Sequence, residues 1–249
     1  MGRVGALLTV AAIAAGCSSS GLFRQYEYEE DVYLSLDGTA TVHVSSSVAA
    51  LNALRGTSLD TSPGAQIDRV RVREFFTTPV TRGVRVTTSR RSRRGFVHVR
   101  LDVDDVRRLG EAAPFAWSRY EFRQDGGLFV YRQALGTAAG KNVGDVGWNG
   151  QELVAVRLHP PSKIEYYTLP GVFKRGNILV WEQPLVERQR SEPLVLEARM
   201  QTQSILYRTL WLFGATSAAV AAAFAILIWW ILRRGVGAAP GPERLQGTR

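Results

Sequence analysis

Apolar and polar residues alternate along most of the chain between residues 26 and 200. The alternation runs over residues 26–36 to Asp37-Gly38, a dipeptide typical of type I′ hairpin turns, and resumes over residues 40–44. Further segments with the same period are 84–86, 97–103, 120–122, 128–130, 153–158, 177–182 and 194–200. Short strands in close succession predict a sheet that is mostly antiparallel.

Two or three short helices complete the predicted α+β domain. They cover residues 48–54, 64–76 and 104–109. Ser47 supplies the N-cap oxygen of the first helix, which ends before Gly56. Ser62-Pro63 is typical of a helix start, although residues 70–73 alternate like a strand. Asp104-Asp105 places negative charge in the first turn of the third helix.

The C-terminal part of the chain has a different pattern, because residues 210–232 carry no charge. At ~1.5 Å per residue they make about 34 Å of helix, enough for a hydrocarbon core of about 30 Å. Trp211 lies at one end, and Trp229 and Trp230 lie at the other, where indole rings favour the headgroup region. These features predict a transmembrane helix over residues 206–232.

Arg233 and Arg234 follow the span at once and indicate that residues 233–249 form a short basic cytosolic tail. Within the span, Gly214, Ala218 and Ala222 recur every four residues, a spacing that lets two helices approach closely. Homodimerisation through this helix is one interpretation. The other is chance, because alanine-rich helices show such spacing often.

The N-terminus has the features of an export signal: Arg3 precedes an apolar stretch, 4–16, that is too short to span comfortably. Small residues then precede Cys17, as in the bacterial lipoprotein cleavage box, although Ala14 replaces the expected large residue. Cys17 is the only cysteine, so no intrachain disulfide is possible, and lipidation would explain a lone exported cysteine. The alternatives are an ordinary signal peptide with an incidental cysteine and an uncleaved signal anchor.

These segments predict four parts: a signal peptide (1–17), an extracytoplasmic domain (21–204), the span and the tail. The expected location is a bacterial cytoplasmic membrane, with the domain on its outer side and Cys17 lipid-anchored.

Positive charge gathers in one region of the predicted domain. Residues 67–108 contain twelve arginines against five acidic residues, in a chain of net charge +9. Four of them, Arg90, Arg91, Arg93 and Arg94, fall between two predicted strands and would form a hairpin tip. Guanidinium groups suit bidentate contact with phosphate or carboxylate, so lipid headgroups and envelope polymers are the expected contacts, and no nucleic acid is expected. The alternative is a solvated turn, partly neutralised by the acidic residues at 27, 29, 30 and 31.

Motifs for catalysis or metal binding are not found. The histidines, His43, His98 and His159, are isolated in sequence, and no nucleophile elbow, phosphate loop or dinucleotide fingerprint occurs. Asp102 with Asp104-Asp105 could hold a hard cation, but helix capping is the favoured interpretation. We expect no catalytic residue, no metal and no cofactor. The glycine-rich segment 137–150 is predicted to be a long loop, either functional or flexible filler.

The order of several short motifs resembles one protein family. After the exported cysteine come Tyr26-Glu27-Tyr28, Leu36-Asp37-Gly38-Thr39-Ala40, residues 158–164, residues 174–181 and the terminal span. This order is similar to that of the LppM-type envelope lipoproteins of mycobacteria and their relatives of unknown function. The resemblance implies a membrane-tethered α+β domain with a lipid- or glycolipid-binding role and no catalytic site. The predicted helical segment at about 47–76 departs from the family pattern, and no ligand residue is carried over.

We therefore expect a non-catalytic, membrane-anchored envelope protein that binds a lipid, a glycolipid or a protein partner. A binding module predicts an apolar cavity between the curved sheet and the helices that accepts acyl chains. One alternative is a structural or assembly protein that acts through its transmembrane helix and a sheet edge, with a filled core and an apolar surface patch. Another is an envelope enzyme, with titratable residues converging in a cleft.

Overall fold

The computed structural model describes residues 24–91, 93–168 and 172–235, which belong to two compact units that meet between Thr202 and Gln203. The elements of the first unit, in chain order, are β1 (Tyr26–Leu34), β2 (Ala40–Ser47), α2 (Val48–Arg55), α3 (Arg69–Phe76), β3 (Thr81–Arg91), β4 (Arg94–Val103), the 3₁₀ helices η1 (Val106–Glu111) and η2 (Ala113–Phe115), β5 (Ser118–Asp125), β6 (Leu128–Leu135), β7 (Leu153–His159), β8 (Ser162–Tyr167), β9 (Val172–Arg175), β10 (Ile178–Pro184), α4 (Leu185–Gln189) and β11 (Leu194–Ser204). The second unit contains α5 (Ile205–Gly235).

The strands form two sheets, which confirms the α+β fold predicted from the sequence. One sheet has seven strands in the order β3-β4-β2-β1-β7-β10-β9, and the other has four in the order β5-β6-β11-β8. The hairpins β1–β2, β3–β4 and β5–β6 are antiparallel, and β1 pairs with β7 in parallel. Inward-facing residues of both sheets belong to one continuous apolar cluster, so the sheets pack face to face.

The alternating pattern correctly predicted which strands pair as hairpins. Gly38 lies in the β1–β2 turn, as expected, with φ 88°. It missed β8 and β9. In β8 only Ser162 and Ile164 are buried, so the strand lacks a run of apolar residues long enough to recognise.

The helices agree with the sequence in part. Ser47 caps α2 by accepting from the backbone N–H of Ala50 at 3.0 Å, as predicted, and Gly56 ends the helix in the left-handed region. The helix predicted over 64–76 is wrong in its first turns: α3 begins only at Arg69, capped by Asp68. Gly64 has φ 85°, which is not helical, and Arg90 of β3 binds the carbonyls of Gly64 and Ala65, so these residues belong to a loop.

The third predicted helix, 104–109, is also corrected. It is the 3₁₀ helix η1, capped by Asp105, and it continues through Gly110. Gly110 lies so close to β5 that an added Cβ would be 2.7 Å from the carbonyl oxygen of Ser118. Close packing, and not helix termination, is therefore the reason for a glycine at this position.

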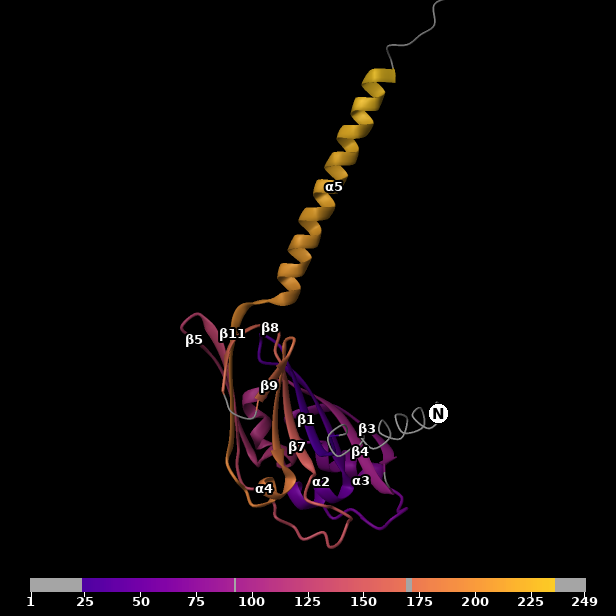
Figure 1. Ribbon diagram of the computed structural model, residues 1–249, viewed down its shortest axis with the longest axis vertical. Coiled ribbons are helices and arrows are strands. Elements are labelled where there is room, and N and C mark those ends of the chain that lie inside the picture. The colour runs from indigo at the N-terminus through magenta and orange to yellow at the C-terminus, as the bar shows by residue number, and fades with distance from the viewer. Residues whose placement is uncertain (1–23, 92, 169–171, 236–249) are drawn as a thin grey trace, which may run out of the picture. The chain divides into compact units, whose positions relative to one another are not determined.

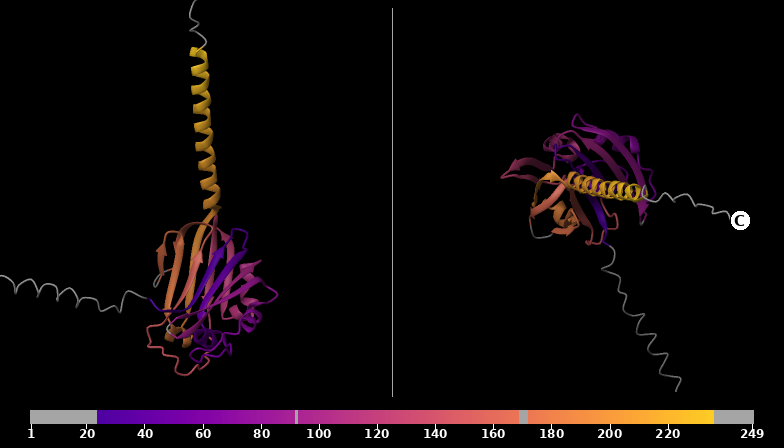
Figure 2. Two further views of the ribbon diagram at one scale, coloured as in Figure 1. Left: turned by 90° about the vertical axis from the view of Figure 1, so that its right-hand side faces the viewer. Right: turned by 90° about the horizontal axis from the view of Figure 1, so that it is seen from above.

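The helices α2, α3 and α4 gather with the loop 137–150 at one end of the strands (Figures 1 and 2). The start of β1, the β3–β4 turn and the end of β6 lie at this end. The opposite end carries the β1–β2 turn and the end of β11, where Ser162 of β8 donates to the carbonyl of Gln201. The chain therefore leaves the first unit at the end opposite α2.

A fully buried carboxylate, Glu30 of β1, joins the two sheets and α2. Its Oε1 accepts from Tyr120 of β5 at 2.8 Å and from Gln133 of β6 at 2.9 Å. Its Oε2 accepts from Tyr28 at 2.9 Å and from the guanidinium of Arg55, at the end of α2, at 2.8 Å. Four donors thus satisfy a charge that would be very costly to bury alone.

The cation of this pair is enclosed by aromatic rings. The Arg55 side chain is 3% exposed, and its guanidinium carbon lies 3.4 Å from the centre of the Trp117 ring. The ring face attracts a cation electrostatically, and this attraction is stronger where water is excluded. The position of α2 on the sandwich is therefore held by a buried charge pair in which all four hydrogen bonds to the carboxylate are made.

Replacing Glu30 by Gln should destabilise the domain by about 3–5 kcal/mol, because it leaves the buried Arg55 cation without a counter-charge. The matched control is Glu29→Gln on the opposite face of the same strand, where a half-exposed pair with Arg157 contributes about 1 kcal/mol or less. Urea unfolding of the detergent-solubilised full-length chain, followed by tryptophan fluorescence, measures both. Equal losses from the two variants would show that Glu30 is not the central contact.

Because buried tyrosines surround Glu30, we expect the stability of the folded domain to fall at alkaline pH. Burial raises the pKa of Tyr28, Tyr120 and Tyr131 above the usual 10.0, and the nearby Glu30 charge adds to the effect. Above about pH 10 the unfolded chain loses protons that the folded chain keeps, so stability falls by up to about 1.4 kcal/mol per pH unit for each tyrosine. Below that pH this contribution is fully present.

Urea midpoints measured from about pH 8 to about pH 11 should therefore decline beyond pH 10. Tyr131→Phe should make the decline shallower, whereas the control Tyr166→Phe, at an exposed position, should leave it unchanged. A decline of the same slope in both variants would contradict the assignment to the buried tyrosines.

In the second unit, α5 contains the predicted span 206–232. Ile205–Arg234 contains an 18-residue stretch with a mean hydropathy of 2.1, and the length and composition of the helix are sufficient to cross a membrane. The guanidinium carbons of Arg233 and Arg234 lie 4.4 and 3.7 Å from the ring centres of Trp229 and Trp230. This arrangement suits a boundary between hydrocarbon and headgroups. Homodimerisation through Gly214, Ala218 and Ala222 stays a prediction.

Candidate functional site

The arginine-rich segment forms the turn of the β3–β4 hairpin, as the sequence predicted. Arg91 pairs with Arg94 across the hairpin, so the turn is short. Arg93 lies in this turn with φ 64°, in the left-handed region that few residues other than glycine adopt. Such a conformation costs about 1–2 kcal/mol and is found most often where it serves a purpose.

A pocket of about 320 Å³ lies between this turn, the start of α2 and residues 60–67. We refer to it as the hairpin pocket. Its basic side chains are Arg90, Arg93 and Arg94, its apolar atoms come from Val48, Ala49, Ile67 and Gly95, and its acidic side chains are Asp60 and Asp145. The fold thus collects residues from four separate segments, 48–49, 60–67, 90–95 and 145–147, around one hollow.

Two of the three basic residues of the hairpin pocket are held in place by the protein. Arg94 lies 3.2 Å from the carboxylate of Glu27, which is fully buried. Arg90 donates to the carbonyl oxygens of Gly64 and Ala65, both at 2.7 Å, and holds their loop against the hairpin. Both guanidiniums therefore have fixed positions before any ligand arrives.

The third basic residue, Arg93, is exposed. It makes no ion pair or side-chain hydrogen bond with the residues that the structure describes. Its five N–H donors are therefore available to a ligand in the pocket. An Arg in a strained backbone conformation with no protein partner is the feature of the site that packing does not explain.

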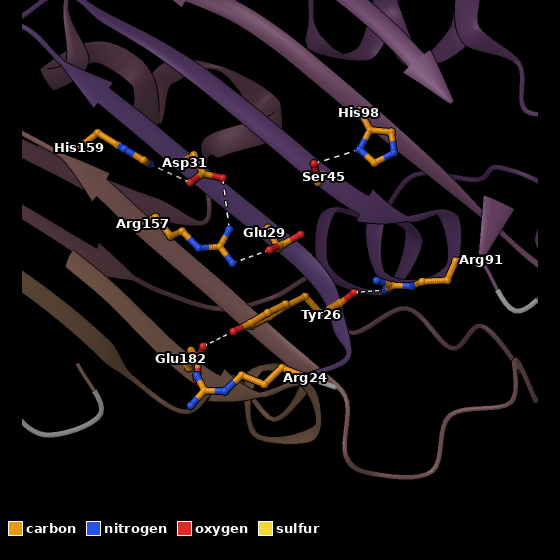
Figure 3. A network of polar contacts seen from close by, with 10 residues as sticks. All are labelled: Arg24, Tyr26, Glu29, Asp31, Ser45, Arg91, His98, Arg157, His159 and Glu182. Carbon is orange, nitrogen blue, oxygen red and sulfur yellow. Dashed lines mark hydrogen bonds and ion pairs between the residues drawn. The ribbon is translucent and has the colours of Figure 1, made fainter. Parts of the chain in front are cut away.

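Arg91, the remaining arginine of the predicted tip, faces away from the hairpin pocket. It donates to the carbonyl of Tyr26 at 2.5 Å (Figure 3). It also packs on the ring of Phe96, with its guanidinium carbon 4.4 Å from the ring centre. The structure thus separates the four predicted anion contacts into three that line the pocket and one that does not. Their role in anion contact stays a prediction.

Residues of α2 position the loops on either side of the hairpin pocket. Asn52 is buried, donates to the carbonyl of Leu59 at 2.8 Å and accepts from its backbone N–H at 3.0 Å. The carbonyls of Ala53 and Leu54 accept from the backbone of the 137–150 loop. This glycine-rich loop is therefore attached to α2 along its first half, and its Asp145, Val146 and Gly147 line the pocket.

The acidic residues of the pocket, Asp60 and Asp145, were not singled out in the sequence. Each begins a tight turn: Asp60 accepts from the N–H of Ser62 at 2.8 Å and Asp145 from that of Gly147 at 3.0 Å. The signal available in the sequence was an Asp two residues before Ser or Gly, which favours an Asx-turn. That signal predicts a turn and says nothing about a pocket.

A second polar cluster occupies the outer face of the seven-stranded sheet (Figure 3). Asp31 contacts His159 at 3.0 Å and Arg157 at 3.3 Å, and Arg157 also binds Glu29 at 2.5 Å. The Tyr33 ring stacks on His159 with centroids 4.0 Å apart. Each of these polar groups therefore has a partner within the cluster.

The remaining candidates from the sequence, the three histidines and the aspartates at 102, 104 and 105, have separate partners in the described part of the chain. His43 lies near Tyr33, and His98 lies between the hydroxyls of Ser45 and Ser89. Burial and the nearby Arg100 lower the pKa of His43. Asp102 binds Thr41, Asp104 pairs with Arg82, and Asp105 caps η1. No group of three or more His, Cys, Asp or Glu in the described residues is placed to hold a metal ion.

Several predictions fall outside the described residues. These are the signal peptide 1–17, the lipidation of Cys17 and most of the tail 233–249.

Comparisons with known proteins add little. No protein-family model matches the chain, and no curated protein matches it. Among solved structures, the chain is similar to the NMR structure of the folded domain of the LppM protein of Mycobacterium tuberculosis. The two share 12% identity over 72% of this chain and 92% of that domain, with a TM-score of 0.41. This is a weak structural resemblance, and we infer neither ligand nor activity from it.

Proposed function

We propose that this protein is a non-catalytic, membrane-anchored binding protein. Its span is α5, and its folded domain takes the phosphate-bearing headgroup of a lipid or glycolipid into the hairpin pocket. The observation that carries the proposal is Arg93, a guanidinium without a protein partner in the described structure, beside the fixed cations of Arg90 and Arg94. Guanidiniums bind phosphate through paired, charge-assisted hydrogen bonds.

The size of the hairpin pocket supports a headgroup and not an acyl chain. About 320 Å³ is the lower end of the range for ligand pockets and equals about ten water-sized groups. Between the sheets and helices, where the sequence led us to expect an apolar cavity, buried side chains form one continuous apolar cluster. A lipid bound here would keep its acyl chains outside the fold.

Location supports the same proposal. A chain with a span such as α5 is confined to a bilayer surface, where phosphate-bearing headgroups are abundant. The strongly perturbed titratable groups, Tyr28, Tyr120 and Tyr131, lie in the core around Glu30 and not in the hairpin pocket. This placement favours binding over catalysis, because catalytic groups are expected to converge in a cleft.

Arg93→Asn should weaken binding of glycerol phosphate and of short-chain phospholipids about ten-fold or more, because a charge-assisted hydrogen bond contributes about 1.5–3 kcal/mol. Asn also adopts the left-handed region readily, so the hairpin should be preserved. The matched control is Arg85→Asn, an exposed arginine of β3 that does not line the pocket. Calorimetric titration of the detergent-solubilised full-length chain measures the affinities.

Native mass spectrometry of the chain extracted from membranes provides a second measurement. Copurified phospholipid or glycolipid is expected with the native chain and with Arg85→Asn, and a reduced amount with Arg93→Asn. The proposal is wrong if the native chain carries no lipid and binds no phosphate compound, or if both variants bind as the native chain does.

A further inference from the structure

The hairpin pocket contains acidic as well as basic groups, which a site for a simple anion would not need. Three guanidiniums line it, those of Arg90, Arg93 and Arg94, together with the carboxylates of Asp60 and Asp145. The buried carboxylate of Glu27 stands behind Arg94 at 3.2 Å. Arg91 also lies 4.0 Å from this carboxylate, so four positive charges lie near three negative ones. An anion therefore gains only a small attraction from the net charge of the site and depends on where each charge lies.

Neither acidic side chain of the pocket forms an ion pair in the described part of the chain. Asp60 and Asp145 use Oδ1 to accept from the N–H groups of Ser62 and Gly147, and no cation of the protein balances either charge there. The hydrogen bonds from Ser62 lower the pKa of Asp60, so this carboxylate is charged at neutral pH. A group with N–H donors and positive charge would match these oxygens.

The two carboxylates are held where they are by the rest of the fold. The loop with Asp145 is attached at Lys141, which donates to the carbonyl of Thr57 at 2.9 Å, and Trp148, next to the pocket-lining Gly147, packs against the core. Asp60 follows directly after Leu59, whose backbone is bound by Asn52. A ligand therefore meets acidic groups that are already in position.

We propose that the hairpin pocket recognises a zwitterionic phosphate ester of the phosphoethanolamine type. Its phosphate lies on Arg93, with Arg90 and Arg94 beside it, and its primary ammonium lies on Asp60 and Asp145. This inference rests on the function proposed above and names the headgroup that the site takes. No reaction is involved, and the ligand is bound unchanged.

The residues that line the pocket favour binding of a primary ammonium over the quaternary ammonium of choline. Recognition of quaternary ammonium groups uses aromatic side chains, because such a group has no N–H to donate. No aromatic residue lines the pocket in the described structure, whereas carboxylate oxygens do. Hydroxyl groups of a polyol headgroup would meet the same oxygens but would leave both negative charges unbalanced.

The experiment titrates the detergent-solubilised full-length chain with glycerophosphoethanolamine, glycerophosphocholine, glycerophosphoinositol and glycerol phosphate. The first should bind tightest, about ten-fold tighter than each of the others. Asp145→Asn keeps the oxygen that accepts from the N–H of Gly147 and removes the charge, so it should weaken glycerophosphoethanolamine binding about ten-fold. It should leave the affinity for glycerol phosphate equal or higher.

Two controls keep the result interpretable. Asp125→Asn removes an exposed carboxylate that does not line the pocket and should change nothing. Asp60→Asn should repeat the effect of Asp145→Asn, and an unchanged melting temperature in each variant shows that folding is preserved.

The outcomes distinguish this inference from the proposed function. If glycerol phosphate, glycerophosphocholine or glycerophosphoinositol binds as tightly as glycerophosphoethanolamine, or if both Asp variants leave the order unchanged, the zwitterion proposal is overturned while phosphate binding stands. If none of the compounds binds, both proposals are overturned.

Discussion

The buried carboxylate of Glu30 is the contact on which the rest of the domain depends. It accepts hydrogen bonds from its own strand, from both β5 and β6 of the second sheet, and from Arg55 at the end of α2. A buried ion pair is not in itself a large source of stability, because removing two charges from water costs about as much as their attraction returns. Its geometric demands are strict, however, so it selects the one arrangement in which all four donors converge.

That arrangement determines where the candidate site lies. Arg55 attaches the C-terminal end of α2 to the core, and the neighbouring residues Asn52, Ala53 and Leu54 hold the two loops that bring Asp60 and Asp145 to the hairpin pocket. The opposite end of α2 contributes Val48 and Ala49 to the pocket lining. The buried ion pair of the core and the candidate pocket are thus connected through one two-turn helix.

The pocket and the exit of the chain lie at opposite ends of the strands. Nine residues of β1 separate these ends by about 30 Å, and the first described residues join the domain at the pocket end. The segments that lead to the two predicted anchors, Cys17 and α5, therefore meet the domain at different ends of the sandwich.

The sequence by itself determined the features that depend on neighbours along the chain. Period-two alternation, the Asp37-Gly38 turn, the Ser47 cap and the uncharged stretch 210–232 have local physical causes, so most strands, α2 and the extent of α5 were predictable. The helix expected at 64–76 failed because the loop that includes Gly64 is held by Arg90, twenty-six residues away in sequence.

Only the tertiary structure decided which charges are buried and which face the pocket. Glu27, Glu29 and Glu30 are near neighbours in the sequence, yet one supports Arg94, one lies on the outer face with Arg157, and one is enclosed in the core. Likewise, Arg91 and Arg93 are two residues apart and have different surroundings. The physical reason is that the energy of a charge depends on its solvation and its partners, which distant segments supply, and composition does not contain that information.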